Sequence, residues 1–142
     1  MLTNSEINCF DIKIADLGYA QKFDKEKGME MCLGTPLYMA PELVKEEKYT
    51  ERVDVWSLGC IVYQLLSGFT PFQATNLGNL NHKILNQKVQ FNEIEWTLVS
   101  KNAKNFIRKC LDKDQNTRPS IKQLLDHPWM SYVDEKDQVS AK

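Results

Sequence analysis

Apolar positions divide the chain into a long stretch without regular period and a following series of helical patterns. The stretch from Leu17 to Val44 fits neither the strand nor the helix period, and glycine and proline interrupt it repeatedly. Between Thr50 and Ser67, apolar residues fall on nearly every side of a helix. A helix that is apolar all round belongs in the middle of a core. We expect Thr50 to cap this helix and Gly68 to end it.

Shorter patterns flank this central helix. Ile12 and Ile14 alternate with polar residues, which predicts a short half-buried strand at residues 11–16. Three amphipathic helices are expected farther along, with apolar stripes Leu77, Leu80, Ile84 and Leu85; Ala103, Phe106, Ile107, Cys110 and Leu111 after Ser100; and Ile121, Leu124 and Leu125. The last follows a capping box of Ser120 with Gln123, and Pro128 is expected to end it. The prediction is a mainly α fold with a short β-hairpin at the N-terminus.

Composition limits which partners the chain can bind and which compartment suits it. A net charge of −1 gives no basic field, so neither nucleic acid nor a membrane surface is expected as a partner. No stretch reads as a transmembrane helix or as a secretory leader. The cysteines form no CxxC pair, and the two histidines lie far apart, where we expect surface or helix-end positions. Trp56, Trp96 and Trp129 are expected in the core. Reduced thiols favour a cytoplasmic setting, with the nucleus not excluded.

An ordered series of short motifs runs through the chain. The motifs are D-L-G at 16–18, G-T-P-L-Y-M-A-P-E at 34–42, D-V-W-S-L-G at 54–59, G-F-T-P-F at 68–72, Arg118, and H-P-W at 127–129. As a set they resemble the eukaryotic protein kinase family, from its metal-binding motif to the end of its large lobe. The form of the 34–42 motif is similar to that of serine/threonine kinases. Residues 80–129 resemble the calcium/calmodulin-dependent and calcium-dependent group, although no EF-hand loop or calmodulin-target helix is present.

This resemblance implies a division of the chain and a role for each motif. It implies a partial kinase domain at 1–130, with the metal-binding motif and activation segment at 16–42, a helical subdomain at 43–130, and a polar tail at 131–142 that frays. Asp16 is expected to hold the Mg²⁺ of ATP, and Gly18 to let the backbone turn after it. The alternative for Asp16 is a turn-forming acid at a strand end. The residues expected to seat the protein substrate are Gly34, Thr35, Pro36, Leu37 and Tyr38.

Three charged residues are expected to have architectural roles. Glu42 and Arg118 lie 76 positions apart, and the resemblance implies that they form a buried salt bridge. The alternative is two unrelated surface charges. The resemblance also implies that Asp54 accepts backbone N–H groups of the catalytic loop. An acid in the first turn of a helix, favoured by the helix dipole, is the alternative for Asp54.

Several parts of a complete kinase do not occur in this sequence. The Gly-rich loop, the strand Lys and the H-R-D loop are missing, so the small lobe and catalytic loop are lacking and the catalytic base is expected upstream of Met1. We therefore expect ATP and Mg²⁺ to act in the full-length kinase, and this chain alone to bind neither and to be inactive. The central helix, uncovered from Trp56 to Leu66, would favour self-association. A naturally truncated, non-catalytic binding module is the alternative function.

Overall fold

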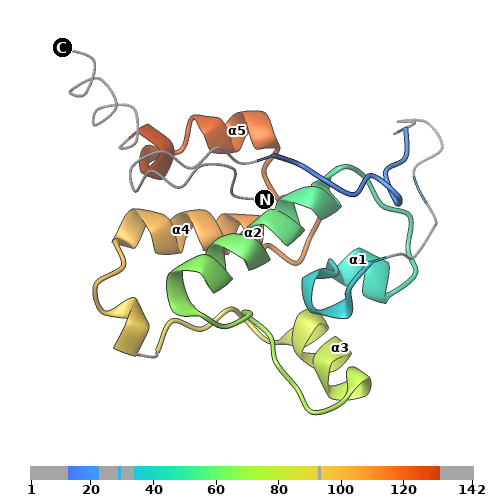
Figure 1. Ribbon diagram of the computed structural model, residues 1–142, viewed down its shortest axis with the longest axis horizontal. Helices are drawn as coiled ribbons and strands as arrows, with labels where there is room; N and C mark the ends of the chain where they lie inside the picture. The colour runs from blue at the N-terminus through green and yellow to red at the C-terminus, as the bar shows by residue number, and fades with distance from the viewer. Residues whose placement is uncertain (1–12, 23–28, 30–33, 93, 132–142) are drawn as a thin grey trace.

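The computed structural model describes residues 13–22, 29, 34–92 and 94–131. Figure 1 shows α2 in the centre, with α1 and α3 to its right, α4 to its left and α5 above it. No β-strand occurs within the described ranges, and the prediction of a mainly α fold is confirmed. The elements in order are η1 (Pro36–Tyr38), α1 (Pro41–Val44), α2 (Arg52–Ser67), α3 (Leu77–Asn86), η2 (Ile94–Trp96), α4 (Lys101–Cys110) and α5 (Ile121–Leu125).

The expected N-terminal β-hairpin falls mostly outside the described residues. In the part of the predicted strand that is described, residues 13–16, the backbone forms no strand and Ile14 is 91% exposed. A strand is stable only in a sheet, and no other strand occurs among the described residues for this segment to join. Met29 and Tyr49 form an isolated antiparallel bridge, exchanging two N–H···O bonds of 3.1 Å.

The central helix forms nearly as predicted, but it begins slightly later. Arg52 is its first residue and Glu51 its N-cap, whereas Thr50 accepts the Arg52 N–H through its hydroxyl oxygen at 3.3 Å. Glu51 has helical dihedrals and makes no side-chain cap bond, so Thr50, one residue earlier, supplies the side-chain bond to the start of the helix. At the other end Gly68 adopts a φ of 82° and donates its N–H to the Gln64 carbonyl at 2.8 Å. This left-handed turn is the one that glycine makes without steric cost.

The core forms around one face of α2. Trp56 and Cys60 are fully buried, and the Trp56 ring stacks on Phe72 with 5.8 Å between centroids. Tyr63, one turn farther along, packs against Trp96 with centroids 4.6 Å apart. Trp56 and Trp96 are core aromatics as predicted, while Trp129 is half-buried. Burial raises the pKa of the free Cys60 thiol, and likewise that of Cys110, to about 12.

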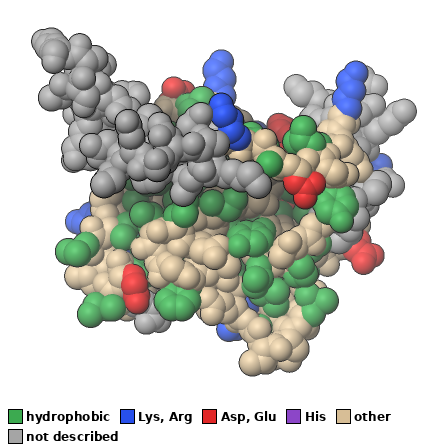
Figure 2. Space-filling view, viewed as in Figure 1, with side chains coloured by type: hydrophobic (Ala, Val, Ile, Leu, Met, Phe, Trp, Pro, Cys, Tyr) green, Lys and Arg blue, Asp and Glu red, His purple; other side chains and the backbone are tan. Residues whose placement is uncertain are grey.

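Part of the outer face of α2 is exposed. Ile61 is 46% exposed and Leu65 is 79% exposed, and on α5 Ile121 and Leu125 are exposed as well. Figure 2 shows hydrophobic side chains gathered across the middle of the face that carries α2. The described part of the chain contains no helix with the length and apolar character needed to cross a bilayer. Trp56 itself is buried, so the exposed apolar surface of α2 is smaller than the surface from Trp56 to Leu66 that the sequence predicted.

The flanking helices carry the predicted caps. Ser100 accepts the Ala103 N–H at 3.1 Å, and Ser120 forms the full capping box with Gln123. The expectation that Pro128 ends the last helix is wrong: α5 ends at Leu125, and Pro128 begins a further helical turn at 128–131. Proline suits a first helical position because its missing N–H has no acceptor there.

His127 is not a surface residue, although it does follow the end of α5. It is 4% exposed, its Nε2 lies 2.9 Å from the Asn105 side-chain oxygen, and its Nδ1 accepts the Trp129 N–H at 3.2 Å. The ring packs edge-on against Phe106, which has no polar atom to offer a charged imidazole. Burial, with a smaller contribution from Lys109, lowers the pKa of His127 below its usual 6.5.

We predict that His127 makes the fold sensitive to acid. In the unfolded chain His127 binds a proton as the pH falls through about 6.5, whereas the folded state resists that proton. The free energy of unfolding should therefore fall with pH below about 6.5, and the His127→Gln variant should lose this part of the slope. Urea unfolding of both proteins above and below that pH measures the difference. The exposed His82 provides the control, because His82→Gln makes the same substitution without removing a buried ring.

Candidate functional site

The segment from Gly34 to Met39 forms a compact loop whose tip faces solvent. Gly34 has a φ of 127°, a conformation that other residues rarely adopt. Thr35 caps η1 with extended backbone, and its carbonyl accepts the Tyr38 N–H at 3.0 Å. Gly34, Thr35 and Pro36 are exposed, whereas Leu37 and Tyr38 are half-buried against the core. The end of the loop that carries Thr35 therefore faces solvent, whereas the end at Leu37 and Tyr38 is anchored.

Two polar side chains of α2 anchor this loop. The Ser57 hydroxyl donates to the Tyr38 carbonyl at 3.0 Å, and the Tyr38 hydroxyl donates to Gln64 Oε1 at 2.8 Å. Ser57 and Gln64 are two helical turns apart, so they lie on one face of α2. The sequence analysis did not predict either role. Two polar residues at this spacing on an otherwise apolar helix are a signal that could have indicated them.

Glu42 and Arg118 form the buried pair that the resemblance implied. Both guanidinium Nη atoms donate to the carboxylate, at 2.7 and 2.9 Å, and the side chains are 3% and 0% exposed. Arg118 also donates to the carbonyl oxygens of Asp112 and Arg52, each at 2.9 Å, and lies 5.2 Å from the centroid of the Trp56 ring. One side chain therefore joins α1, the start of α2 and the loop after α4.

Asp16 has the local geometry of a turn. Its φ is 61°, and its Oδ1 accepts the Gly18 N–H at 3.2 Å. A Cβ on residue 18 would lie 3.2 Å from that same oxygen, which explains why glycine suits the position. Asp16 is exposed, so the rest of its carboxylate faces solvent. The structure therefore shows the turn role, and the geometry leaves lone pairs available for a cation.

The structure does not assemble the expected metal and substrate residues into one cluster. A cavity of about 570 Å³ brings Leu17 and Tyr19, just after Asp16, beside Asp54 and Ser57 at the start of α2. Asp16 and Thr35 do not line it. No group of three metal-ligating side chains occurs in the described ranges. Asp54 lies in the first turn of α2, and its pKa is raised, first by desolvation and then by the nearby Glu51.

The sequence of this chain matches a known protein family. Residues 1–130 match the protein kinase domain, which is nearly the whole chain. The chain belongs to the protein kinase family. The resemblance stated from the motifs is thereby confirmed.

The relatives of this kinase chain are serine/threonine kinases. A probable myosin light chain kinase of Dictyostelium discoideum is 44% identical over 95% of this chain and 39% of its own length. The mouse skeletal/cardiac muscle myosin light chain kinase 2 is 36% identical, covering 88% of this chain and 20% of its own length. The Arabidopsis thaliana serine/threonine-protein kinase PEPKR2 is also 36% identical, covering 88% of this chain and 26% of its own length. The chain thus spans well under half of each relative, and its likeness to the calcium/calmodulin-dependent group is confirmed.

Lys113 is a further residue of this kinase chain that the sequence analysis missed. Its Nζ donates to the Ile84 carbonyl in the last turn of α3, and it lies over the Phe72 and Trp56 rings, 4.2 and 4.9 Å from their centroids. A lysine at a helix C-terminus bonds carbonyls that have no partner within the helix. Desolvation lowers the pKa of Lys113 to about 8, aided by the nearby Arg118. Only the folded chain brings α3 and the loop after α4 close enough for this contact.

Proposed function

We propose that this chain forms part of the large lobe of a serine/threonine kinase that transfers the γ-phosphate of ATP to protein Ser or Thr. The loop Gly34–Tyr38 seats the protein substrate, and Asp16 holds the metal ion of the nucleotide. The observation that carries the proposal is the anchored loop: its tip is exposed, while Tyr38 and Glu42 are held by three side chains from elsewhere in the fold. A surface that must position a hydroxyl within an ångström needs such a rigid support.

The residues present fit a magnesium–nucleotide complex. Mg²⁺ usually takes one or two carboxylates together with phosphate oxygens and water, and it does not require a cage of protein ligands. A single exposed acid, Asp16, with one oxygen bonded to the Gly18 N–H, meets that requirement. When bound, the ion would neutralise negative charge on the phosphates. The chain's own part is to hold the carboxylate in a fixed turn and to present Thr35 beside the substrate hydroxyl.

The test is a chimaeric kinase. The upstream part of the kinase domain of the Dictyostelium relative is joined to this chain, and phosphate transfer to a Ser- and Thr-containing protein is measured. We expect transfer by the chimaera and a loss of about 100-fold or more with Asp16→Ala, because positioned metal charge provides several kcal/mol of the barrier reduction. Thr35→Ala should lower transfer less. Phosphoamino-acid analysis should find label on Ser and Thr.

A matched control separates the metal role from a general effect of losing an acid. Asp126 is exposed at the end of α5, so Asp126→Ala should leave transfer unchanged. Equal transfer by the Asp16→Ala chimaera and its parent would contradict the assignment of Asp16. We further propose that the 142-residue chain alone transfers no phosphate. Transfer by the purified chain, abolished by Asp16→Ala, would contradict this, whereas an inactive chimaera would favour the non-catalytic binding module.

We also propose that the isolated chain self-associates through the outer face of α2. Ile61 and Leu65 of α2 are exposed, as are Ile121 and Leu125 of α5. The two α5 residues line an apolar hollow together with Val62, Phe106 and Trp129 among others. Contiguous apolar surface of this kind favours association in water. Light scattering over a dilution series should show an average mass that decreases as the protein is diluted. At a given concentration, the Leu65→Lys variant should have a mass nearer to that of the monomer. A constant monomer mass would contradict the proposal.

Free Cys60 and Cys110 thiols support a cytoplasmic setting.

A further inference from the structure

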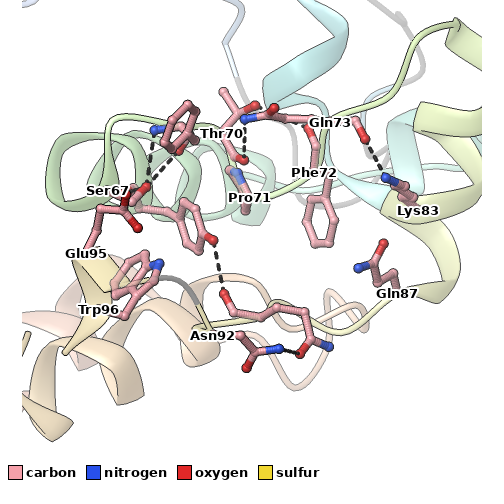
Figure 3. A pocket seen from close by; sticks show the side chains of 13 residues that line it. Ser67, Thr70, Pro71, Phe72, Gln73, Lys83, Gln87, Asn92, Glu95 and Trp96 are labelled. Atoms are coloured by element: carbon pink, nitrogen blue, oxygen red, sulfur yellow. Dashed lines mark hydrogen bonds between the residues drawn. The ribbon is translucent and has the colours of Figure 1, made fainter.

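A groove runs between the loop after α2 and the segment after α3. One wall comes from residues 67–73, the other from Gln87 to Asn92, and Trp96 of η2 closes one end. Its volume is about 560 Å³, which is enough for several amino-acid residues of a ligand. Figure 3 shows Ser67 and Thr70 on one wall and Asn92 on the other, with the aromatic residues between them. It lies apart from Asp16 and from the Thr35 loop, which do not line it.

Four primary amides line this groove. Gln73, Gln87, Gln90 and Asn92 all face it. A primary amide carries two donor hydrogens and an acceptor oxygen. Gln73 and Gln90 each use one donor within the chain, on the Thr70 and Lys88 carbonyls at 3.4 and 3.3 Å. Asn92 donates to the Gln90 side chain at 3.2 Å, and Gln87 makes no side-chain bond with any described residue. Such a lining matches the alternating N–H and C=O groups of an extended polypeptide, which also carry no net charge.

The backbone along one wall has unused donors. From Lys88 to Asn92 the chain is neither helix nor turn, and exposure alternates: Val89 and Phe91 are half-buried against the core, and their neighbours are exposed. The Gln90 carbonyl accepts the Tyr63 hydroxyl at 3.0 Å. The N–H groups of residues 88–92 have no acceptor in the described part of the chain. An extended segment with unpaired N–H groups is a template for adding a strand from another chain.

A buried donor at the end of the groove points to the same kind of ligand. Trp96 is 1% exposed, and its indole N–H has no acceptor among the described residues. Figure 3 shows the indole nitrogen on the edge of the ring turned toward the interior of the groove. A buried donor without a partner costs about 1–3 kcal/mol, so an incoming carbonyl oxygen would remove a penalty already present in the free chain.

Opposite charges stand at the two ends of the groove. In Figure 3, Glu95 lies at the Trp96 end and Lys83 lies at the far end beside Gln73. The Lys83 ammonium donates to the Gln73 carbonyl at 2.6 Å, which leaves two of its three hydrogens for another acceptor. A ligand with an uncharged middle, one basic end and one acidic end complements this distribution.

We propose that this groove binds an extended segment of a partner protein through its backbone, with a basic side chain at the Glu95 end and an acidic one at the Lys83 end. The segment pairs with the backbone of Lys88–Asn92, and a carbonyl oxygen accepts the Trp96 indole N–H. This binding is independent of phosphate transfer, so it can be tested whether or not the proposed kinase activity is borne out.

The probe is a library of short, end-blocked peptides with Lys at one end, Glu at the other, and randomised uncharged residues between them. Binding to the 142-residue chain is measured by fluorescence anisotropy for the enriched sequences. We expect N-methylation of alternate backbone amides to weaken these peptides by about tenfold or more, because each methyl removes a donor to the groove. Since N-methylation leaves the protein unchanged, a loss of fold cannot cause this result.

Charge reversal in the protein gives the matched test. Glu95 is exposed, so Glu95→Lys should keep the fold, verified by circular dichroism, and should shift preference by about twofold to fivefold toward peptides acidic at both ends. Lys83→Glu should shift preference toward peptides basic at both ends. The proposal is overturned if no peptide is enriched, if enriched peptides tolerate N-methylation, or if both variants keep the original preference.

Discussion

Replacing Arg118 by methionine is expected to lower the free energy of unfolding by about 3–5 kcal/mol, because Glu42 would remain buried without its partner. The Asp112 and Arg52 carbonyls would lose their donor in the same variant. Urea unfolding followed by tryptophan fluorescence measures the loss, since Trp56 lies directly beside the Arg118 guanidinium. In the active chimaera the same change should also lower phosphate transfer, because only Met39, Ala40 and Pro41 separate Glu42 from the loop that we propose to seat the substrate.

An exposed ion pair in the same region provides the control. Lys45 and Glu47 lie 3.7 Å apart with side chains 48% and 54% exposed, so Lys45→Met should change stability by less than about 1 kcal/mol. The double variant Glu42→Leu with Arg118→Met should recover part of the loss, because no buried carboxylate is left unpaired. If Arg118→Met costs no more than Lys45→Met, the buried pair does not stabilise the fold.

Gly59→Ala is expected to destabilise the chain by about 1–3 kcal/mol through overpacking of α2 against α4. A Cβ at residue 59 would lie 2.6 Å from the Cys110 Cβ and 3.0 Å from the Leu111 Cδ2. Both atoms belong to rigid, buried residues at the end of α4, so the two helices must move apart. Alanine would otherwise favour the helix by about 0.5–1 kcal/mol, and the steric cost is expected to outweigh that gain. Thermal and urea unfolding both report the sign.

Gly78 is the matched position, since it is also a glycine inside a helix. It lies in the first turn of α3, is exposed, and a Cβ there would have Asn76 Oδ1 as its nearest neighbour at 3.6 Å. Gly78→Ala should therefore stabilise the chain by about 0.5–1 kcal/mol. Opposite signs at the two glycines would support close helix contact at Gly59. If alanine changed the free energy of unfolding in the same direction at both positions, α2 and α4 could move apart at little cost, which would contradict this prediction.

Local sequence was enough to predict the helices and most of their ends. The apolar positions of Leu80 and Ile84, the capping box of Ser120 and the glycine stop at Gly68 all act within a few residues, and the structure shows each of them. Period and capping depend on neighbours one turn away, which is why a single sequence contains that information. Pro128 was misread because proline is compatible with both the end of one helix and the first turn of the next.

The motifs also determined the family, and through it the expectation that Glu42 and Arg118 would pair. Periodicity and spacing could not have predicted that contact, because it joins segments 76 residues apart whose approach depends on how α1, α2 and α4 pack. The assignment of Asp16 to a metal and of residues 34–38 to substrate stays a prediction, argued from the family and the loop's anchoring. The described residues show the turn at Asp16 and the exposed tip at Thr35.

Tertiary structure alone decided the contacts of single polar residues with distant elements. Ser57 and Gln64 hold Tyr38 at the end of the Gly34–Tyr38 loop, Lys113 caps α3 between two rings, and His127 is buried against Asn105. The chain's pattern of apolar and polar residues indicated which face of each helix is buried. It could not indicate which distant carbonyl or ring a polar side chain meets, because that depends on the relative placement of whole helices, and this is fixed only when the core packs.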